Sequence, residues 1–200
     1  MQKSLTTNAL TAAMALALLA GGCREKLVAD TPDFTEYGWE LWTELDYRGA
    51  IIQFEEGLAF DESYADTWNG LGWAYIELGA ADTSDTKFDR GILLEDTTDV
   101  MVELLAGRAF SSLATGDFTA AVTDAKNALT ASPVWIFKRN TAITYEDLMI
   151  TVATGFYGAA EFDSSLVWVK KLDSNFDADV TTPAGRSALA AQIELLASSS

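Results

Sequence analysis

The side chains in this sequence that could do chemistry are mainly carboxylates, because it has 30 Asp and Glu residues, no histidine and one cysteine. Histidine is the usual general base near neutral pH and a common zinc ligand, so its absence excludes Ser–His–Asp and Cys–His catalysis and the usual zinc sites. Two carboxylates could still serve a hydrolase as acid and base, but no spacing singles out a pair. With no glycine-rich phosphate loop either, we expect no enzymatic activity, no catalytic residues, no metal and no cofactor.

The chain is strongly acidic, with 13 Lys and Arg residues against those 30 carboxylates and a net charge of -17. Such a surface repels the phosphates of DNA and RNA and the headgroups of anionic lipids. We therefore expect no nucleic-acid partner. The charge is typical of a solvated surface, and the alternative is a surface that attracts a basic partner.

The first 23 residues combine a short apolar stretch with a cysteine. Lys3 precedes an apolar stretch at 12–20, AAMALALLA, which is too short to span a bilayer but fits a secretory signal. Small residues at 20–22 then stand directly before Cys23, the only cysteine. This order of residues resembles a bacterial lipoprotein leader, and the resemblance implies cleavage before Cys23 and lipid attachment to its thiol and new amino group. Several acyl chains would give a durable membrane anchor, because each buried methylene adds about 0.8 kcal/mol.

The expected location follows from the same leader. In such lipoproteins Asp after the cysteine favours retention in the inner membrane, and this chain has Arg24 there. We therefore expect an anchor in the bacterial cell envelope, at the outer membrane and facing the periplasm. Residues 1–22 would be the signal peptide and 23–32 the lipidated cysteine and its tether.

The rest of the chain carries an internal repeat. Residues 68–79 read WNGLGWAYIELG, which places Trp68, Leu71, Gly72 and Tyr75 in the pattern W-x2-L-G-x2-Y. That pattern is typical of the first helix of a 34-residue tetratricopeptide (TPR) repeat. The positions that correspond one period apart are Gly38 and Gly72, Trp39 and Trp73, Phe54 and Phe88, and Gly57 and Gly91.

The sequence thus resembles TPR proteins, and the resemblance implies an all-α solenoid of three to four helical hairpins. The repeats would lie at about 31–64, 65–98, 102–135 and 146–179 within a domain spanning 33–200, closed by a capping helix at about 183–197. The first helix would begin at a capping box of Asp33 and Glu36. The third repeat departs from the pattern, because Arg108 and Ser112 occupy the usual Leu and Tyr places.

One insertion interrupts the repeats. Residues 134–144, VWIFKRNTAIT, are β-branched, aromatic and locally basic through Lys138 and Arg139. We expect an extended loop or a short hairpin over one end of the solenoid. It is either a partner-binding insertion or a packed spacer, and the sequence favours neither.

In TPR proteins the first helices of the repeats line a concave groove. The resemblance implies that this groove contains Trp39, Trp42, Asn69, Trp73, Glu77, Phe110 and Tyr157. Exposed aromatic side chains there would suit an apolar or extended peptide, or sugar rings. The alternative is that a neighbouring helix, the 134–144 loop or the C-terminal helix buries some of them. Trp68 and Tyr75 are expected in the core.

These observations favour a lipid-anchored scaffold or adaptor that binds a protein or peptide partner. A glycan-binding lipoprotein that uses the groove tryptophans is the alternative from another class, and a carboxylate-based hydrolase is a minor one. The clamp by which some TPR proteins bind a peptide's C-terminal carboxylate is missing, since Asn69 stands beside Asp66 and Glu103 rather than beside basic residues. The partner and the oligomeric state stay open.

Overall fold

The protein is an array of helical pairs, seen here in a computed structural model that describes residues 29–95 and 97–199. The predicted leader and Cys23 lie outside the described residues. Nine helices lie within them. In chain order they are α2 (Thr31–Thr43), α3 (Tyr47–Leu58), α4 (Ala65–Glu77), α5 (Ala81–Leu94), α6 (Thr98–Thr115), α7 (Phe118–Ala131), α8 (Tyr145–Gly158), α9 (Phe162–Leu172) and α10 (Pro183–Ser199). None of these helices is both long and apolar enough to cross a membrane.

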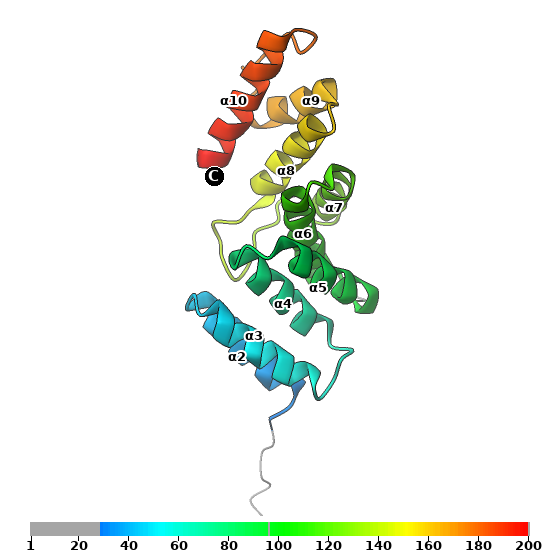
Figure 1. Cartoon of the computed structure of the whole chain (residues 1–200), viewed down its shortest axis with the longest axis vertical. Helices are drawn as coiled ribbons and strands as arrows, with labels where there is room; N and C mark the ends of the chain where they lie inside the picture. The colour runs from blue at the N-terminus through cyan, green and yellow to red at the C-terminus, as the bar shows by residue number, and fades with distance from the viewer. Residues whose placement is uncertain (1–28, 96, 200) are drawn as a thin grey trace, which may run out of the picture.

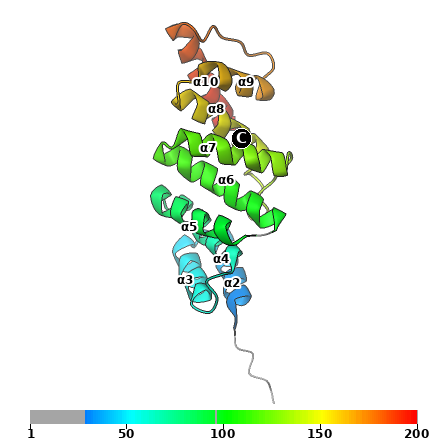
Figure 2. The same cartoon turned by 90° about the vertical axis from the view of Figure 1, so that its right-hand side faces the viewer.

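The helices pair in sequence order and the pairs stack along one axis, from α2 and α3 to α10 at the far end (Figures 1 and 2). The first helix of each pair also contacts the first helix of the next, in the order α2, α4, α6 and α8. Among the described residues the second helices make no such contacts with one another. The first helices therefore lie closer together and form the inner, concave side. The all-α solenoid expected from the sequence is confirmed.

The repeated glycines let aromatic rings pack between helices. A Cβ atom on Gly38 would lie 2.5 Å from the ring of Phe54, and one on Gly72 would lie 2.5 Å from the ring of Phe88. Both rings are fully buried. Only glycine leaves room for a ring at that distance. Glycine and phenylalanine therefore recur one period apart because successive helical pairs use the same packing.

The first helix begins earlier than expected. Asp30, not Asp33, is its N-cap, and Asp30 and Asp33 form the capping box. Pro32 lies in the first turn, where the missing N–H of proline costs no hydrogen bond. The predicted tether thus ends before Thr31. Farther along, Thr144 and Asp147 form a capping box at the start of α8.

The last helix covers the C-terminal end of the array. α10 packs on α8 and α9, and its Leu189 and Ile193 join a buried cluster with Ile150 and Val169. This helix extends over Pro183–Ser199, close to the predicted capping helix at about 183–197. It removes apolar surface that an open solenoid end would expose to water.

The insertion at 134–144 does not lie over an end of the solenoid. It descends from α8 along the side of α6 and α4 (Figure 1) and contacts the concave faces of α2 and α4. This position corrects the sequence expectation. Its physical cause is apolar burial, because the segment carries an aromatic side chain that only the concave side can enclose.

Candidate partner-binding groove

The concave side of the first three helical pairs gathers an aromatic cluster. Trp39 and Trp42 come from α2, Trp73 from α4 and Phe110 from α6. The ring centroids of Trp39 and Trp42 are 6.0 Å apart, and those of Trp73 and Phe110 are 5.9 Å apart. The structure thus brings four of the seven predicted groove residues together around one space, which we call the aromatic groove.

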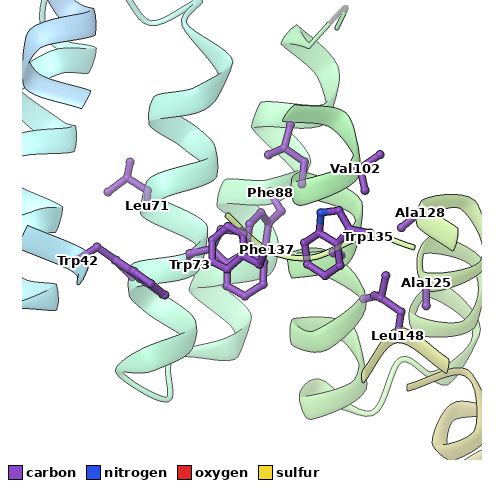
Figure 3. Packing of buried hydrophobic residues seen from close by; sticks show 14 of the residues in the cluster. Trp42, Leu71, Trp73, Phe88, Val102, Ala125, Ala128, Trp135, Phe137 and Leu148 are labelled. Atoms are coloured by element: carbon purple, nitrogen blue, oxygen red, sulfur yellow. The ribbon is translucent and has the colours of Figure 1, made fainter. Parts of the chain in front are cut away.

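A residue of the chain's own insertion fills this groove. Phe137 is fully buried and stacks on Trp73, with ring centroids 4.2 Å apart and ring planes at 17° (Figure 3). Its edges face Trp42 at 5.6 Å and Trp39 at 6.1 Å. Trp135 also stacks on Phe137, with ring centroids 6.0 Å apart and ring planes at 29°. Phe137 is therefore enclosed by aromatic rings from two helices and from its own loop.

The groove tryptophans are consequently not exposed, and of the two alternatives that the sequence left open the structure shows burial by the 134–144 loop. Trp39 and Trp73 are 0% exposed and Trp42 is 3% exposed. Trp68, which was expected in the core, is half-buried: it packs against the core cluster, and the Lys87 ammonium lies 5.4 Å from the centroid of its ring. A role of the groove residues in binding a partner stays a prediction, but any partner must first meet the insertion.

The two basic residues of the insertion face carboxylates of the groove. The Arg139 guanidinium lies over the Trp39 ring at 4.7 Å and pairs with Glu36 at 3.9 Å and Asp66 at 4.0 Å. Lys138 Nζ lies 3.3 Å from a carboxylate oxygen of Glu103. The insertion therefore carries positive charge to an otherwise acidic face.

Asn69 connects these carboxylates inside the groove. Its side-chain amide is fully buried and donates to Asp66 at 3.1 Å and to Glu103 at 2.9 Å. The indole N–H of Trp39 donates to Asp66 at 3.1 Å. Burial raises the pKa of Glu103, and the charge of Lys138 and the hydrogen bond from Asn69 partly oppose that shift. The predicted site residue Asn69 is thus part of a polar network at the groove floor.

Several buried polar atoms of the groove lack a hydrogen-bond partner within the described part of the chain. They are Nε1 of Trp42, Nε1 of Trp73 and Oδ1 of Asn69, and from the insertion Nε of Arg139. Buried polar groups are nearly always paired in folded proteins, and each unpaired one costs about 1–3 kcal/mol. The insertion therefore fills the groove sterically but leaves part of its hydrogen-bonding capacity unused.

The insertion is held in its own shape by a short antiparallel contact. Ile136 and Thr144 form an isolated bridge, the N–H of Phe137 donates to Ile143 O at 2.9 Å, and the N–H of Tyr145 donates to Trp135 O at 2.7 Å. The hairpin alternative of the sequence thus describes it best. Alternation along the hairpin points Trp135 and Phe137 inward and leaves Val134 and Ile136 exposed.

The remaining predicted groove residues lie outside the aromatic groove. Glu77 is exposed at the end of α4 beside Tyr47 of α3. Tyr157 packs edge-on against Phe162, with centroids 5.2 Å apart, in the cluster shared by α8, α9 and α10. The concave face is therefore divided, and the aromatic groove belongs to α2, α4 and α6 alone.

A pocket of about 320 Å³ borders the insertion on its α6 and α7 side. Val102 and Trp135 are buried in it, while Val134 and Ile136 are 74% and 53% exposed at its rim. Asp99, Glu103 and Lys138 add polar groups. This pocket lies between α6, the end of α7 and the insertion, beside the aromatic groove.

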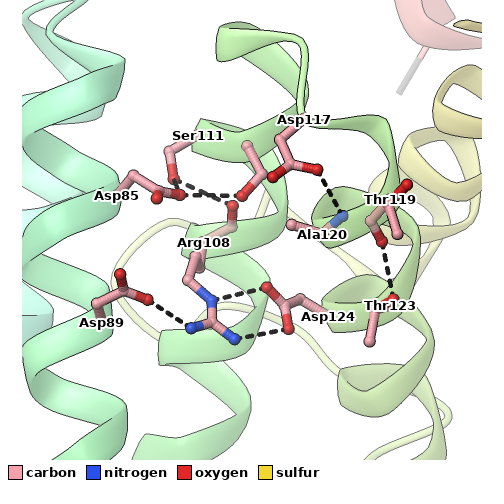
Figure 4. A network of polar contacts seen from close by, with 10 residues as sticks. Asp85, Asp89, Arg108, Ser111, Asp117, Thr119, Ala120, Thr123 and Asp124 are labelled. Atoms are coloured by element: carbon pink, nitrogen blue, oxygen red, sulfur yellow. Dashed lines mark hydrogen bonds and ion pairs between the residues drawn. The ribbon is translucent and has the colours of Figure 1, made fainter.

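The sequence named the 134–144 loop as one of three elements that could bury the groove aromatics, and in the structure it does so. The sequence feature that favours the insertion is its charge and aromatic content, since Lys138 and Arg139 follow Trp135 and Phe137 in a chain of net charge -17. Sequence reasoning missed the ion pairs that explain why Arg108 occupies a place where the TPR pattern has Leu. Arg108 donates through Nε and Nη2 to Asp124 at 2.7 and 2.8 Å and pairs with Asp89 (Figure 4).

The hydroxyls of Ser111 and Ser112 extend this network by donating to Asp85 at 3.0 and 2.9 Å. Together these contacts join α5, α6 and α7 by polar bonds where the TPR pattern would use apolar packing. Hydrogen bonds to Asp124 raise the pKa of the Arg108 guanidinium, which stays charged. Among the described residues, no three acidic, histidine or cysteine side chains are grouped so as to hold a metal ion.

No protein-family model matches this sequence, and comparison with curated proteins gives no match either. Solved structures do match. A crystal structure of MamA protein has a TM-score of 0.60 at 20% identity over 72% of each chain. A second MamA structure has a TM-score of 0.58 at 19% identity and covers 80% of this chain and 81% of that one.

PilW, described as a widely conserved type IV pilus biogenesis factor, has a TM-score of 0.57 at 14% identity over 74% of this chain and 63% of its own. At these identities the likeness concerns the fold. Together with the repeated helical pairs, it identifies the architecture as that of TPR-type proteins.

Proposed function

We propose that this TPR-type α-solenoid is a lipid-anchored scaffold of the bacterial cell envelope that binds a protein or peptide partner. One observation carries the partner class: the concave face of α2, α4 and α6 already encloses an extended stretch of polypeptide. Aromatic rings and carboxylates contact that stretch, and these are groups that recognise apolar and basic side chains.

The cell-envelope location rests on the leader. The apolar stretch at 12–20, the small residues after it and the single Cys23 support secretion and lipid attachment. The first helix begins at Thr31, so the solenoid would follow Cys23 after a short tether. Feeding a fatty-acid analogue to a lipoprotein-competent bacterium tests this: wild-type protein should be labelled and the Cys23→Ser variant should not. An unlabelled wild-type chain would contradict lipid attachment at Cys23.

The glycan alternative finds no favourable geometry. Sugar rings stack on exposed aromatic faces, whereas Phe137 covers the face of Trp73 and Arg139 covers that of Trp39. The carboxylates nearest the groove, Asp66 and Glu103, are engaged by Asn69 and by the basic residues of the insertion. We therefore develop the protein-binding function only.

Photo-crosslinking in the native cell tests the partner. A crosslinker placed at Val134 would sample the concave face, and one placed at Leu93 of α5 would sample the outer helices at a similar exposure of 78%. We expect one or a few discrete protein adducts from Val134 that are missing from Leu93. Identical adducts from both positions, or none from Val134, would contradict a concave binding face.

A further inference from the structure

We propose that residues 134–144 are an internal ligand of the aromatic groove, and that the groove accepts an external peptide of the same chemistry in their place. That chemistry is an aromatic side chain followed directly by two basic side chains in an extended backbone. The inference rests on the proposed function, because it names the class of partner segment that the same groove would bind.

The aromatic requirement comes from the surroundings of Phe137. Its ring is fully buried, stacked on Trp73 and bordered by Trp39 and Trp42. An enclosed aromatic anchor of this kind is typical of the residue that dominates binding at an interface. A ligand without an aromatic side chain would leave this space empty.

The basic requirement comes from the carboxylates around the groove. Arg139 pairs with Glu36 and Asp66, and Lys138 pairs with Glu103. Without the insertion, the buried Glu103 and the largely buried Asp66 would face the groove with no cation beside them. Unpaired buried charge is costly, so any replacement must bring positive charge to the same places.

The unused hydrogen-bonding groups indicate that the insertion is an imperfect occupant. Trp42 Nε1, Trp73 Nε1 and Asn69 Oδ1 are buried without partners in the described part of the chain. An extended peptide presents free backbone carbonyl and N–H groups, which can pair with indole donors and an amide oxygen. A longer external segment therefore has bonds to gain that the hairpin does not make.

The architecture allows the insertion to leave without dismantling the solenoid. α7 contacts α8 directly, so the stacking of the third and fourth helical pairs does not depend on the segment between them. The insertion contributes an isolated bridge rather than a sheet, and Val134, Ile136 and Lys138 already face solvent. Its opening would expose the groove while the helical pairs keep their contacts.

The covalent attachment of the insertion determines how strongly it competes with a free peptide. A segment held close to its site has an effective concentration on the order of 1 mM, so the same sequence added as a free peptide binds the wild-type groove poorly. The apparent affinity falls with the fraction of molecules whose groove is open. Weakening the contacts of the insertion should therefore reveal the site.

The experiment uses a labelled peptide with the sequence of residues 134–144 and measures its binding by fluorescence anisotropy. The purified full chain is compared with a loosened variant, Phe137→Ala/Arg139→Ala. We expect the loosened variant to bind the peptide at least about tenfold more tightly than wild type, because its insertion no longer competes. A Val134→Ala/Ile136→Ala variant, altered only at exposed positions of the same hairpin, should behave like wild type.

A control peptide carrying the same two alanines should not bind the loosened variant. Equal affinity of the first peptide for wild type and loosened protein would overturn the proposal, because the peptide would then bind elsewhere. So would absence of binding to a loosened variant that keeps its helical circular dichroism.

If the loosened variant loses its helical signal, hydrogen exchange on the wild-type protein decides. The amides of Phe137 and Tyr145 report on the hairpin, since they donate to Ile143 O and Trp135 O. Exchange of these amides at a lower free energy than the central amides of α4 and α6 would show that the hairpin opens by itself. Exchange only with global unfolding would make the insertion a fixed part of the core and overturn the proposal.

The two proposals can fail separately. If crosslinking from Val134 yields a partner while the hairpin opens only with the whole protein, the scaffold function stands and the internal-ligand inference falls. If the peptide binds the loosened variant and the cell yields no adduct, the groove chemistry stands and the scaffold function falls.

Discussion

At the scale of single residues, neighbouring tryptophans in one helix have opposite environments. Trp73 is fully buried under Phe137, whereas Trp68 is half-buried and lies near Lys87 and Arg90. The two residues are five positions apart, which puts them on different faces of α4. Trp68, which matches the TPR motif, lies nearer the surface, whereas Trp73, which the motif does not require, is the core residue.

The ion pair of Arg108 with Asp124 gives a residue-scale prediction. Asp124 is 3% exposed, so Arg108→Ala should leave a buried charge without its partner and lower the free energy of unfolding by about 3 kcal/mol. The double variant Arg108→Leu/Asp124→Ala should lose much less, because no charge stays buried. Urea unfolding of both variants checks this, and equal losses would show that the pair itself is not what stabilises this contact.

Glu103 gives a prediction about pH. Burial holds its folded-state pKa above the ordinary 4.5, so its stabilising contribution is full below that value and is lost as pH rises through the folded pKa. The free energy of unfolding of the wild type should therefore fall relative to that of Glu103→Gln as pH rises from 4.5 toward neutrality. The opposite slope would mean that pairing with Lys138 outweighs burial.

At the scale of elements, the hairpin at 134–144 decides what the concave face offers. It joins α7 to α8, yet its side chains pack on α2 of the first helical pair and α4 of the second. Glycine and phenylalanine positions fix how the helical pairs stack, and the hairpin fixes which of their faces meets water.

The hairpin's burial of Trp73 can be checked by fluorescence. Phe137→Ala should open space beside Trp73 and Trp42, shift the indole emission to longer wavelength and increase quenching by acrylamide. Ile136→Ala, which changes an exposed neighbour in the same hairpin, is the matched control and should leave the emission unchanged. An unaltered spectrum for Phe137→Ala would place the hairpin elsewhere in solution.

At the scale of the whole molecule, the net charge of -17 opposes the compact state by self-repulsion. We expect the thermal midpoint to rise between about 0.05 and 0.5 M sodium chloride, because the screening length falls below about 10 Å over that range. A rise of roughly 2–4 °C corresponds to 1 kcal/mol in a domain of this size.

The exposed pair Glu55 and Glu56 on α3 provides the control for that prediction. Replacing both by Gln makes the net charge less negative and should flatten the response of the midpoint to salt. A midpoint that falls with salt in the wild type would mean that ion pairs such as those of Arg139 outweigh the general repulsion.

The sequence by itself determined the helical pairs and their stacking, because these depend on local spacing: Trp68 to Tyr75 within one helix, and Gly38 and Phe54 within one pair. It also placed Trp39, Trp42, Asn69 and Trp73 on one face. Only the tertiary structure decided that this face is occupied, since Phe137 and Arg139 reach it from a distant part of the chain. A repeat pattern fixes which side chains share a face, but burial of that face depends on contacts whose distance in sequence follows no period.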